Sequence, residues 1–303
     1  VLTREAGFYF YFSRKIRELR ECGHEGTARA YASSLRSMQR YLGKKDFPFI
    51  KLSSRIISDY QGKLLASGIC DNTIGFYLHN IKALFRKGCR EMGLELPCPF
   101  RDISIKTEKT LKRSLDPVVI KTLSAIELEK DSPLSLARDI FMFSFYTRGM
   151  SFVDIALLKK RHVFPGEICY RRHKTDQLMR VGINKEISRI LERYKNVPGE
   201  YIFPLFPAER DPYAGYRSAY HRIRYSLGKI SRVIGLEFPL RLHAARHSWA
   251  TIAKVNGASV HVIGECLGHT SEKTTRIYLK ELDHSALDAV NNQVADFILA
   301  VDD

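Results

Sequence analysis

The segment that most constrains the fold of this chain is ELPCPFRDISIKTEKT, residues 95–110, which carries two prolines and several charges and has no helical period. Prolines and clustered polar residues interrupt helices and strands, so this segment predicts a linker between folded parts. The whole chain has 303 residues, a length that suits two domains better than a single core. We therefore expect two domains, at residues 1–105 and 106–303.

Residues 4–92, before the linker, predict a helical domain. Their apolar side chains recur every three or four positions, which is the spacing of amphipathic helices. Gly23 and Gly43 are placed to end the first two helices, and Ser53 and Asp71 to begin the third and the fourth as N-terminal caps. Four short amphipathic helices make a small bundle.

The residues after the linker predict a larger, mainly helical domain with a small β-hairpin. Two short runs, EICYRR at 167–172 and LMRVGIN at 178–184, have the composition of strands and flank the turn HKTDQ. Helices are expected at 117–126, 133–147, 152–160, 185–195, 214–234 and through the last quarter of the chain. The expected fold class is mainly α with a small β-sheet or hairpin.

The net charge of the chain indicates a polyanionic partner. Lys and Arg number 49 against 33 Asp and Glu, which gives a formal charge of +16 and a pI near 9.6. Such an excess either repels itself or meets negative charge, and nucleic acid is the first candidate.

The remaining composition excludes other classes of protein. No apolar run approaches the roughly 18 residues of a membrane span, and the N-terminal VLTREAGFYF lacks the cationic and then apolar order of a secretion signal. The six cysteines form no CxxC pair, so we expect reduced thiols and no metal site. The expected location is cytoplasmic and nucleoid-associated, with no membrane partner.

The helical segment LRLHAARHSWATIAKV carries two polar side chains on a face that otherwise predicts a core. His243 and Arg246 are one turn apart, on the side of Leu242 and Trp249. A guanidinium there costs several kcal/mol unless an anion or a tight partner receives it. For this pair alone the structural alternative is favoured, namely an arginine bonded to a carboxylate or to carbonyls at a helix end.

Three further residues supply chemistry for breaking a phosphodiester without a metal. His269 follows a helix end, Tyr278 lies nine residues on, and Lys174 stands on the hairpin turn. With the first pair they provide a phenol that attacks phosphorus, cations that hold the pentacovalent phosphorane, and an acid that protonates the departing 5′ oxygen. Each has an ordinary alternative, since one tyrosine among 15 and a cation on a hairpin tip signal little by themselves.

Together these residues resemble the tyrosine recombinase, or phage-integrase-type, family. HAARH with LGHTSEKTTRIY resembles its HxxR and LGH…Y boxes, KTDQLMRVGI its lysine-bearing hairpin, and YTRGMSFVDIALL its first arginine box. The boxes follow the family order over residues 148–278, and the N-terminal helices resemble the family's SAM-like core-binding domain. The resemblance implies a catalytic domain of the DNA breaking-rejoining fold at 106–303, a clamp on two faces of DNA, and a subunit-contact helix at 284–299.

The resemblance also implies a role for each candidate residue. Tyr278 would be the nucleophile, Arg246 a phosphate clamp, and Lys174 the general acid. His243 would act as general acid or base and as a donor to the phosphate, and His269 as a second donor. This chemistry needs no cofactor and no metal.

One departure from the family pattern concerns the first arginine box, which usually places its arginine three residues before an acidic residue. In this chain the residue three before Asp154 is Ser151. Arg148 lies one turn earlier and its long side chain could reach the same phosphate, so we expect Arg148 to substitute, with a purely structural Arg148 as the equal alternative. The variant box resembles recombinases of Bacteroides-type bacteria and their mobile elements, which suggests DNA inversion or element integration.

Several side chains outside these boxes are candidate DNA contacts, because guanidinium and amide groups bind phosphates or base edges. The alternative for each one singly is a solvated helix face. The candidates lie on the second and fourth helices, beside the hairpin lysine, and on the 214–234 helix: Arg29, Arg36, Asn72, Asn80, Lys82, Arg172 and Arg217.

The function that these features predict is site-specific recombination. A homotetramer would act on double-stranded DNA with inverted-repeat core sites, cut each strand through a 3′-phosphotyrosyl link and rejoin the strands through a Holliday junction. Accessory DNA-bending proteins are further expected partners.

Two alternatives remain open, and a third is disfavoured. ATIAKVNGASVHVIGECLGH mimics a helix-turn-helix with Gly257 at its turn, which would suit a non-catalytic regulator. A type IB topoisomerase would use similar chemistry without a defined site. A metal nuclease is disfavoured, because no carboxylates cluster at suitable spacing near the histidines.

Overall fold

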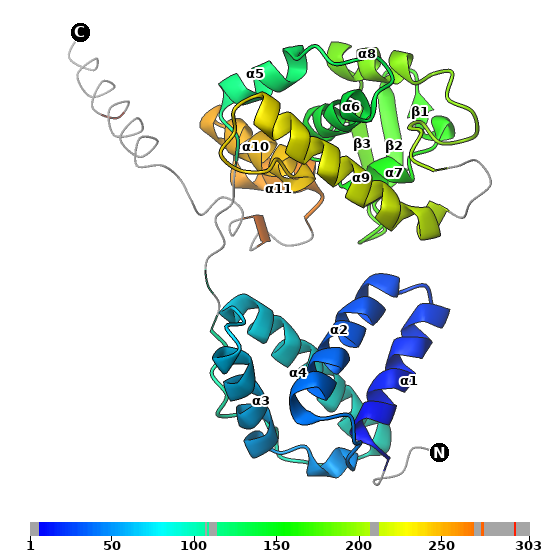
Figure 1. The fold of residues 1–303 in the computed structure, drawn as a ribbon. Coiled ribbons are helices and arrows are strands. Elements are labelled where there is room, and N and C mark those ends of the chain that lie inside the picture. The colour runs from blue at the N-terminus through cyan, green and yellow to red at the C-terminus, as the bar shows by residue number, and fades with distance from the viewer. Residues whose placement is uncertain are drawn as a thin grey trace. The chain divides into compact units, whose positions relative to one another are not determined.

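The computed structural model describes residues 6–106, 108, 114–206, 212–269, 274–275 and 294, without the side chains of 212–214. The chain divides into two compact units, Val1–Thr110 and Leu111–Asp303, where the sequence predicts a boundary after residue 105. Each unit is described by itself (Figure 1). The predicted fold class, mainly α with a small sheet, is confirmed.

The first unit contains the four helices expected from the sequence. They are α1 (Phe8–Glu21), α2 (Glu25–Leu42), α3 (Ser54–Ala66) and α4 (Asp71–Met92), with a short 3₁₀ turn at Phe49–Lys51. The Ser53 hydroxyl accepts a hydrogen bond from the Ile56 N–H at 3.4 Å and so caps α3 as expected. The cap of α4 is Cys70, and Asp71 is instead the first helical residue, where its negative charge favours the helix N-terminus.

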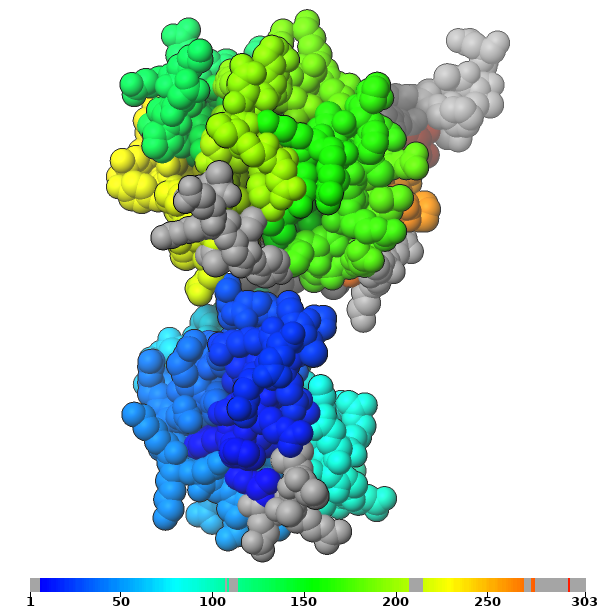
Figure 2. Space-filling view, turned by 90° about the vertical axis from the view of Figure 1, so that its right-hand side faces the viewer, coloured from blue at the N-terminus to red at the C-terminus, as the bar shows by residue number. Residues whose placement is uncertain are grey.

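Aromatic side chains fill the core of the first unit. Phe8, Phe12, Phe49 and Tyr60 are fully buried, and the Phe49 and Phe85 rings stack with their centroids 5.4 Å apart. Figure 2 shows the dark blue surface that α1 and α2 contribute to one face of this unit. The helices therefore pack around one apolar interior and leave their charged faces outside.

The second unit is built around one buried helix. The helix α6 (Pro133–Tyr146) begins at Ser132, whose hydroxyl accepts from the Ser135 N–H at 3.1 Å, and it buries Ile140, Phe141 and Phe143 completely. Figure 1 shows it surrounded by other helices. These are α5 (Pro117–Ala125), α7 (Phe152–Ala156), α8 (Lys185–Arg193), α9 (Pro212–Val233) and α10 (Leu242–Val255), and α11 (Val260–Leu267) packs on α10.

The sheet of the second unit has three antiparallel strands rather than the two expected. The predicted hairpin is β2 (Glu167–Arg171) and β3 (Leu178–Gly182), and β1 (Val163–Phe164) adds to the free edge of β2. A strand of two residues has too little alternation to be seen in a sequence.

The helix expected at 152–160 is shorter in the structure. It ends at Ala156, because Leu158 is buried and its carbonyl accepts from the Ile202 N–H at 3.1 Å, while the Lys160 N–H donates to the Glu200 carbonyl at 2.8 Å. Pairing with this distant segment replaces the last turns of the helix. The expected subunit-contact helix at 284–299 lies outside the described residues, apart from residue 294.

Among the helices of the described residues, none is both long enough and apolar enough to cross a membrane.

Candidate active site

Arg246 is the centre of the site. It lies in the middle of α10, and only 7% of its surface is exposed. Its Nη1 donates to the Gly149 carbonyl at 2.8 Å, and its Nη2 donates to the Leu267 carbonyl at 2.5 Å and lies 3.1 Å from Nε2 of His269. These three contacts fix the orientation of the guanidinium through its N–H donors.

The turn after α6 is shaped to receive Arg246. Arg148 and Gly149 both adopt left-handed backbone conformations, with φ of 60° and 76°. A Cβ at Gly149 would lie 2.5, 2.7 and 2.8 Å from Cγ, Cβ and Cα of Arg246, so only glycine fits against α10. The chain turns back after α6 here, with the Gly149 N–H donating to the Ser144 carbonyl at 2.7 Å, and this presents the Gly149 carbonyl to Arg246.

His269 lies beside Arg246 at the end of α11. Gly268 ends that helix in the left-handed conformation, and the His269 N–H donates to the Gly264 carbonyl at 3.0 Å. On its other side the imidazole Nδ1 is 2.9 Å from the Thr275 hydroxyl. Burial, and then the charges of Arg246, Arg172 and Lys174, lower the pKa of His269 to about 4. His269 is therefore neutral at neutral pH.

His243 lies one turn before Arg246 on α10. Its side chain is exposed, so the prediction that both residues lie on a core face is wrong for His243. Its ring lies edge-on to that of His247, with the centroids 4.6 Å apart. Desolvation by surrounding atoms and then the Arg246 charge lower its pKa. Both histidines of the site are therefore held in the form that can accept a proton.

The hairpin brings two cations to the same helix end. Arg172, after β2, is half-buried, and its Nη1 donates to the Gly268 carbonyl at the end of α11. Lys174 is exposed on the turn, and its charge is one of those that lower the pKa of His269. The sequence suggests Arg172 only as a DNA contact, whereas the structure places it next to His269. Its position two residues before Lys174 is the sequence feature that could have indicated this place in the site.

Ser151 and Asp154 occupy the place of the expected arginine box. The Ser151 hydroxyl donates to Oδ2 of Asp154 at 2.6 Å, and Oδ1 of Asp154 accepts from the His173 N–H at 2.8 Å. Asp154 is buried, so its carboxylate ties the start of α7 to the base of the hairpin turn. This anchor was missed from the sequence, although Ser-x-x-Asp resembles a helix-capping pattern.

Arg148 lies in the neighbourhood of the other two arginines. Burial, and then Asp154, raise the pKa of the Tyr170 hydroxyl, and the charges of Arg172, Arg246 and Arg148 oppose that shift. The three guanidinium groups thus act on one buried phenol. The structure brings together Arg246, His243, His269, Lys174 and Arg148, while Tyr278 lies outside the described residues.

The predicted DNA contacts of the first unit fall into two groups. Two amides make internal bonds: the Asn80 Nδ2 donates to the Ser34 hydroxyl at 3.0 Å, and the Asn72 amide exchanges two 3.0 Å bonds with the Glu108 backbone. Arg29 pairs with Glu25 at 2.8 Å. The others present more surface: Arg36 is exposed and Lys82 is half-buried, and Arg217 on α9 of the second unit is exposed.

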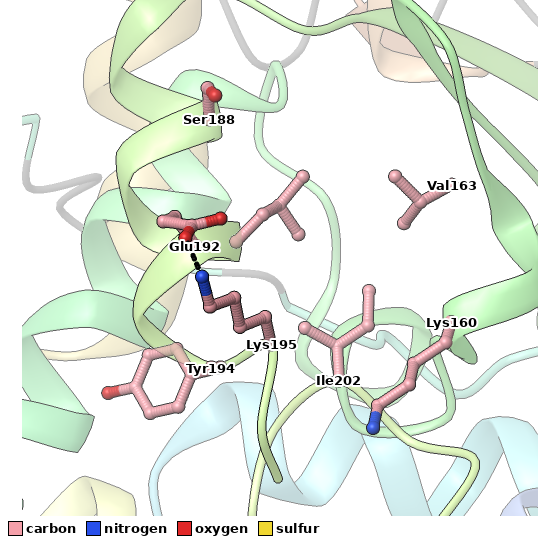
Figure 3. Close-up of a pocket in the computed structure, with 8 residues that line it drawn as sticks. Lys160, Val163, Ser188, Glu192, Tyr194, Lys195 and Ile202 are labelled. Atoms are coloured by element: carbon pink, nitrogen blue, oxygen red, sulfur yellow. Dashed lines mark hydrogen bonds and ion pairs between the residues drawn. The ribbon is translucent and has the colours of Figure 1, made fainter.

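A separate hollow of about 280 Å³ lies between α8 and the chain near β1. Figure 3 shows Lys195 beside Glu192 on its wall, with Lys160 and Ile202 opposite. None of the site residues described above lines it. Among the residues that the structure describes, no group of three His, Cys, Asp or Glu side chains is placed to hold a metal ion.

Two family models match most of the chain. Residues 114–284 match the Phage integrase family, and residues 7–100 match the Phage integrase SAM-like domain. The tyrosine recombinase XerC of Shewanella oneidensis is 26% identical over 226 residues, which are 71% of this chain and 70% of that protein.

Two solved structures share the fold. The lambda integrase (75–356) dimer bound to a COC′ core site has a TM-score of 0.67 at 17% identity, covering 92% of this chain and 98% of that one. The Tn1549 transposon integrase in complex with transposon right end DNA has a TM-score of 0.69 at 14% identity, covering 96% and 100%.

Proposed function

We propose that this chain, which belongs to the phage integrase family, is a site-specific DNA recombinase that cleaves and rejoins DNA strands. The observation that carries the proposal is the buried guanidinium of Arg246, held by two carbonyls and a neutral imidazole and joined at the end of α11 by Arg172. A buried guanidinium held in one orientation, with a second arginine beside it, is suited to bind a phosphate.

The reaction is a transesterification in which the bonds balance. The phenol oxygen of Tyr278 attacks the scissile phosphorus, the bond from phosphorus to the 5′ oxygen breaks, and a 3′-phosphotyrosyl ester forms. Neutral His243 accepts the phenol proton, and Lys174 gives a proton to the departing 5′ oxygen. The reverse attack by a 5′ hydroxyl of another strand rejoins DNA and needs no external energy source.

Positive charge for the phosphorane comes from the chain itself. Arg246 and Arg172 hold the phosphate oxygens, and Arg148 contributes from the turn after α6 in the absence of an arginine at position 151. Arg246 is buried, so its charge is screened by less water and is worth more than in solution. The reaction accordingly proceeds without a metal or another cofactor.

The partners follow from strand exchange. Two cut sites with two strands each require four active sites, hence a homotetramer on two DNA segments with inverted-repeat core sites. The basic charge of +16 supports binding of the backbone. We place the reaction in the cytoplasm, on the nucleoid or a mobile element, with integration or inversion as the outcome and accessory DNA-bending proteins as helpers.

The test uses a suicide substrate, a duplex nicked near the scissile phosphate. Cleavage then releases a short fragment with a free 5′ hydroxyl, which diffuses away. The wild-type chain forms a denaturant-resistant protein–DNA adduct, and Tyr278→Phe binds the same DNA but forms none. Binding without any adduct from the wild type would favour the helix-turn-helix regulator. Relaxation of plasmids that lack the site would favour the topoisomerase.

A further inference from the structure

Thr275 is a buried polar residue that the proposed reaction does not use. It is fully buried, and its hydroxyl lies 2.9 Å from Nδ1 of His269. On its other side it packs against α11 at Gly264, where a Cβ would come within 2.9 Å of the same hydroxyl oxygen. Thr275 therefore fits a notch that exists only because residue 264 has no side chain.

The two neighbours of His269 determine which of its nitrogens carries the proton. The guanidinium of Arg246 has only donors, so Nε2 of His269, 3.1 Å from Nη2, must be an acceptor. The proton of the neutral imidazole then sits on Nδ1, which donates to the Thr275 hydroxyl. In this arrangement His269 orients Arg246 through Nε2. The second phosphate donor that the sequence predicts at His269 would require the other tautomer, with the proton on Nε2.

We propose that Thr275 is a positioning residue, which fixes the tautomer and the ring plane of His269. The inference rests on the proposed function and deepens it. Without the Thr275 hydroxyl the imidazole ring of His269 loses its partner at Nδ1, and its contact with Arg246 at Nε2 is held less firmly. The orientation of Arg246 thus depends in part on the hydroxyl at position 275.

Two substitutions at position 275 separate the hydroxyl from the volume. Thr275→Val keeps the branched shape and removes the acceptor, while Thr275→Ser keeps the acceptor. With saturating suicide substrate, we expect Thr275→Val to lower the single-turnover cleavage rate about tenfold or more, the scale seen when an orienting partner of a functional histidine is lost. Thr275→Ser retains most of the rate, and DNA affinity is unchanged in both.

Gly264→Ala tests the notch without touching a polar group. The new methyl group displaces Thr275 and slows cleavage, whereas α11 itself is not weakened, because alanine favours helix over glycine. A Gly264→Ala variant that unfolds at the same urea concentration as the wild type but cleaves slowly supports the positioning role of Thr275. Cleavage at the wild-type rate would overturn that role.

A readout specific to the mechanism is the protonation of His269. In ¹⁵N spectra of the full chain, the wild type shows Nδ1 protonated and Nε2 unprotonated, and Thr275→Val shifts the balance towards the other tautomer. In a His269→Ala background, adding Thr275→Val slows cleavage no further, because the residue through which it acts is gone. An unchanged tautomer in Thr275→Val, or a full additional loss in the double variant, contradicts the proposal.

Failure of the inference differs from failure of the proposed function. If the wild type forms the covalent adduct and Thr275→Val forms it equally fast, the proposed function is supported and the proposed role of Thr275 is refuted. If the wild type forms no adduct, the function falls, and the ¹⁵N spectra still decide whether Thr275 sets the tautomer.

Discussion

Replacing Gly149 with alanine tests how tightly the turn after α6 is fitted to Arg246. The backbone there has φ of 76°, a conformation that costs an L-residue about 1–2 kcal/mol. The added Cβ also lies 2.5 to 2.8 Å from Cγ, Cβ and Cα of Arg246, and such overpacking costs about 1–3 kcal/mol more. Because one of the three atoms belongs to the backbone of α10, a change of rotamer alone does not relieve the clash.

The matched control is Gly257→Ala, at the turn between α10 and α11. Its φ is 84°, and no atom lies within 4 Å of the Cβ that alanine would add. It therefore carries the backbone cost of about 1–2 kcal/mol without the clash. The difference between the two variants isolates the contact with Arg246.

Urea unfolding followed by tryptophan fluorescence measures this difference. Trp249 is the only tryptophan of the chain and lies on α10, three residues after Arg246, so its emission reports unfolding of the second unit. We expect Gly149→Ala to be less stable than Gly257→Ala by about 1–3 kcal/mol, and to cleave suicide substrate more slowly under conditions where both are folded. Equal losses of stability in the two variants would refute the claim that the turn at Gly149 packs tightly against Arg246.

Three further predictions concern the chemistry of the site. Asp154→Asn keeps one acceptor oxygen for two donors, so either the Ser151 hydroxyl or the His173 N–H loses its acceptor. We expect this variant to slow cleavage about tenfold or more. If the loss is in protonation by Lys174, a substrate with sulfur in place of the scissile 5′ oxygen restores the rate. A rate that is not restored would contradict the proposal that Asp154 positions the hairpin. We expect NMR titration of His269 to give a pKa of about 4, and a pKa at its ordinary value would contradict its burial beside three cations. Since its folded pKa lies below its ordinary value of about 6.5, the stability it contributes is present above that value and is lost as pH falls towards 4. Arg172→Ala raises this pKa by removing a positive charge, and an unmoved titration would place Arg172 elsewhere. EDTA leaves the cleavage rate unchanged, because Arg246 and Arg172 supply the positive charge, and a loss restored by added Mg²⁺ would contradict that account.

Local patterns account for what could be predicted from the sequence. The four helices of the first unit, the hairpin and the cap at Ser53 all follow from spacings within a few residues. Arg246 illustrates how the two interpretations of one residue coexist. The structural interpretation, an arginine bonded to carbonyls near helix ends, describes its contacts with Gly149 and Leu267. The same contacts fix the orientation of its charge, which the proposed phosphate clamp requires.

Contacts between distant segments account for what could not be predicted. Arg172 reaches the end of α11 across 96 positions, and Asp154 reaches the hairpin across 19. Asn80 looks like a DNA-reading amide on a helix, yet its partner Ser34 lies 46 positions away on α2. The early end of α7 likewise depends on pairing with residues near 200. No periodicity in one segment carries such information, because it arises only when the chain packs.

The identity of the residue esterified to DNA tests the central claim most directly. The adduct trapped on a suicide substrate is digested with a protease and a nuclease, and the modified peptide is sequenced by mass spectrometry. The account predicts a nucleotide joined through its 3′ phosphate to Tyr278. A 5′ linkage, or attachment to any other side chain, would contradict it.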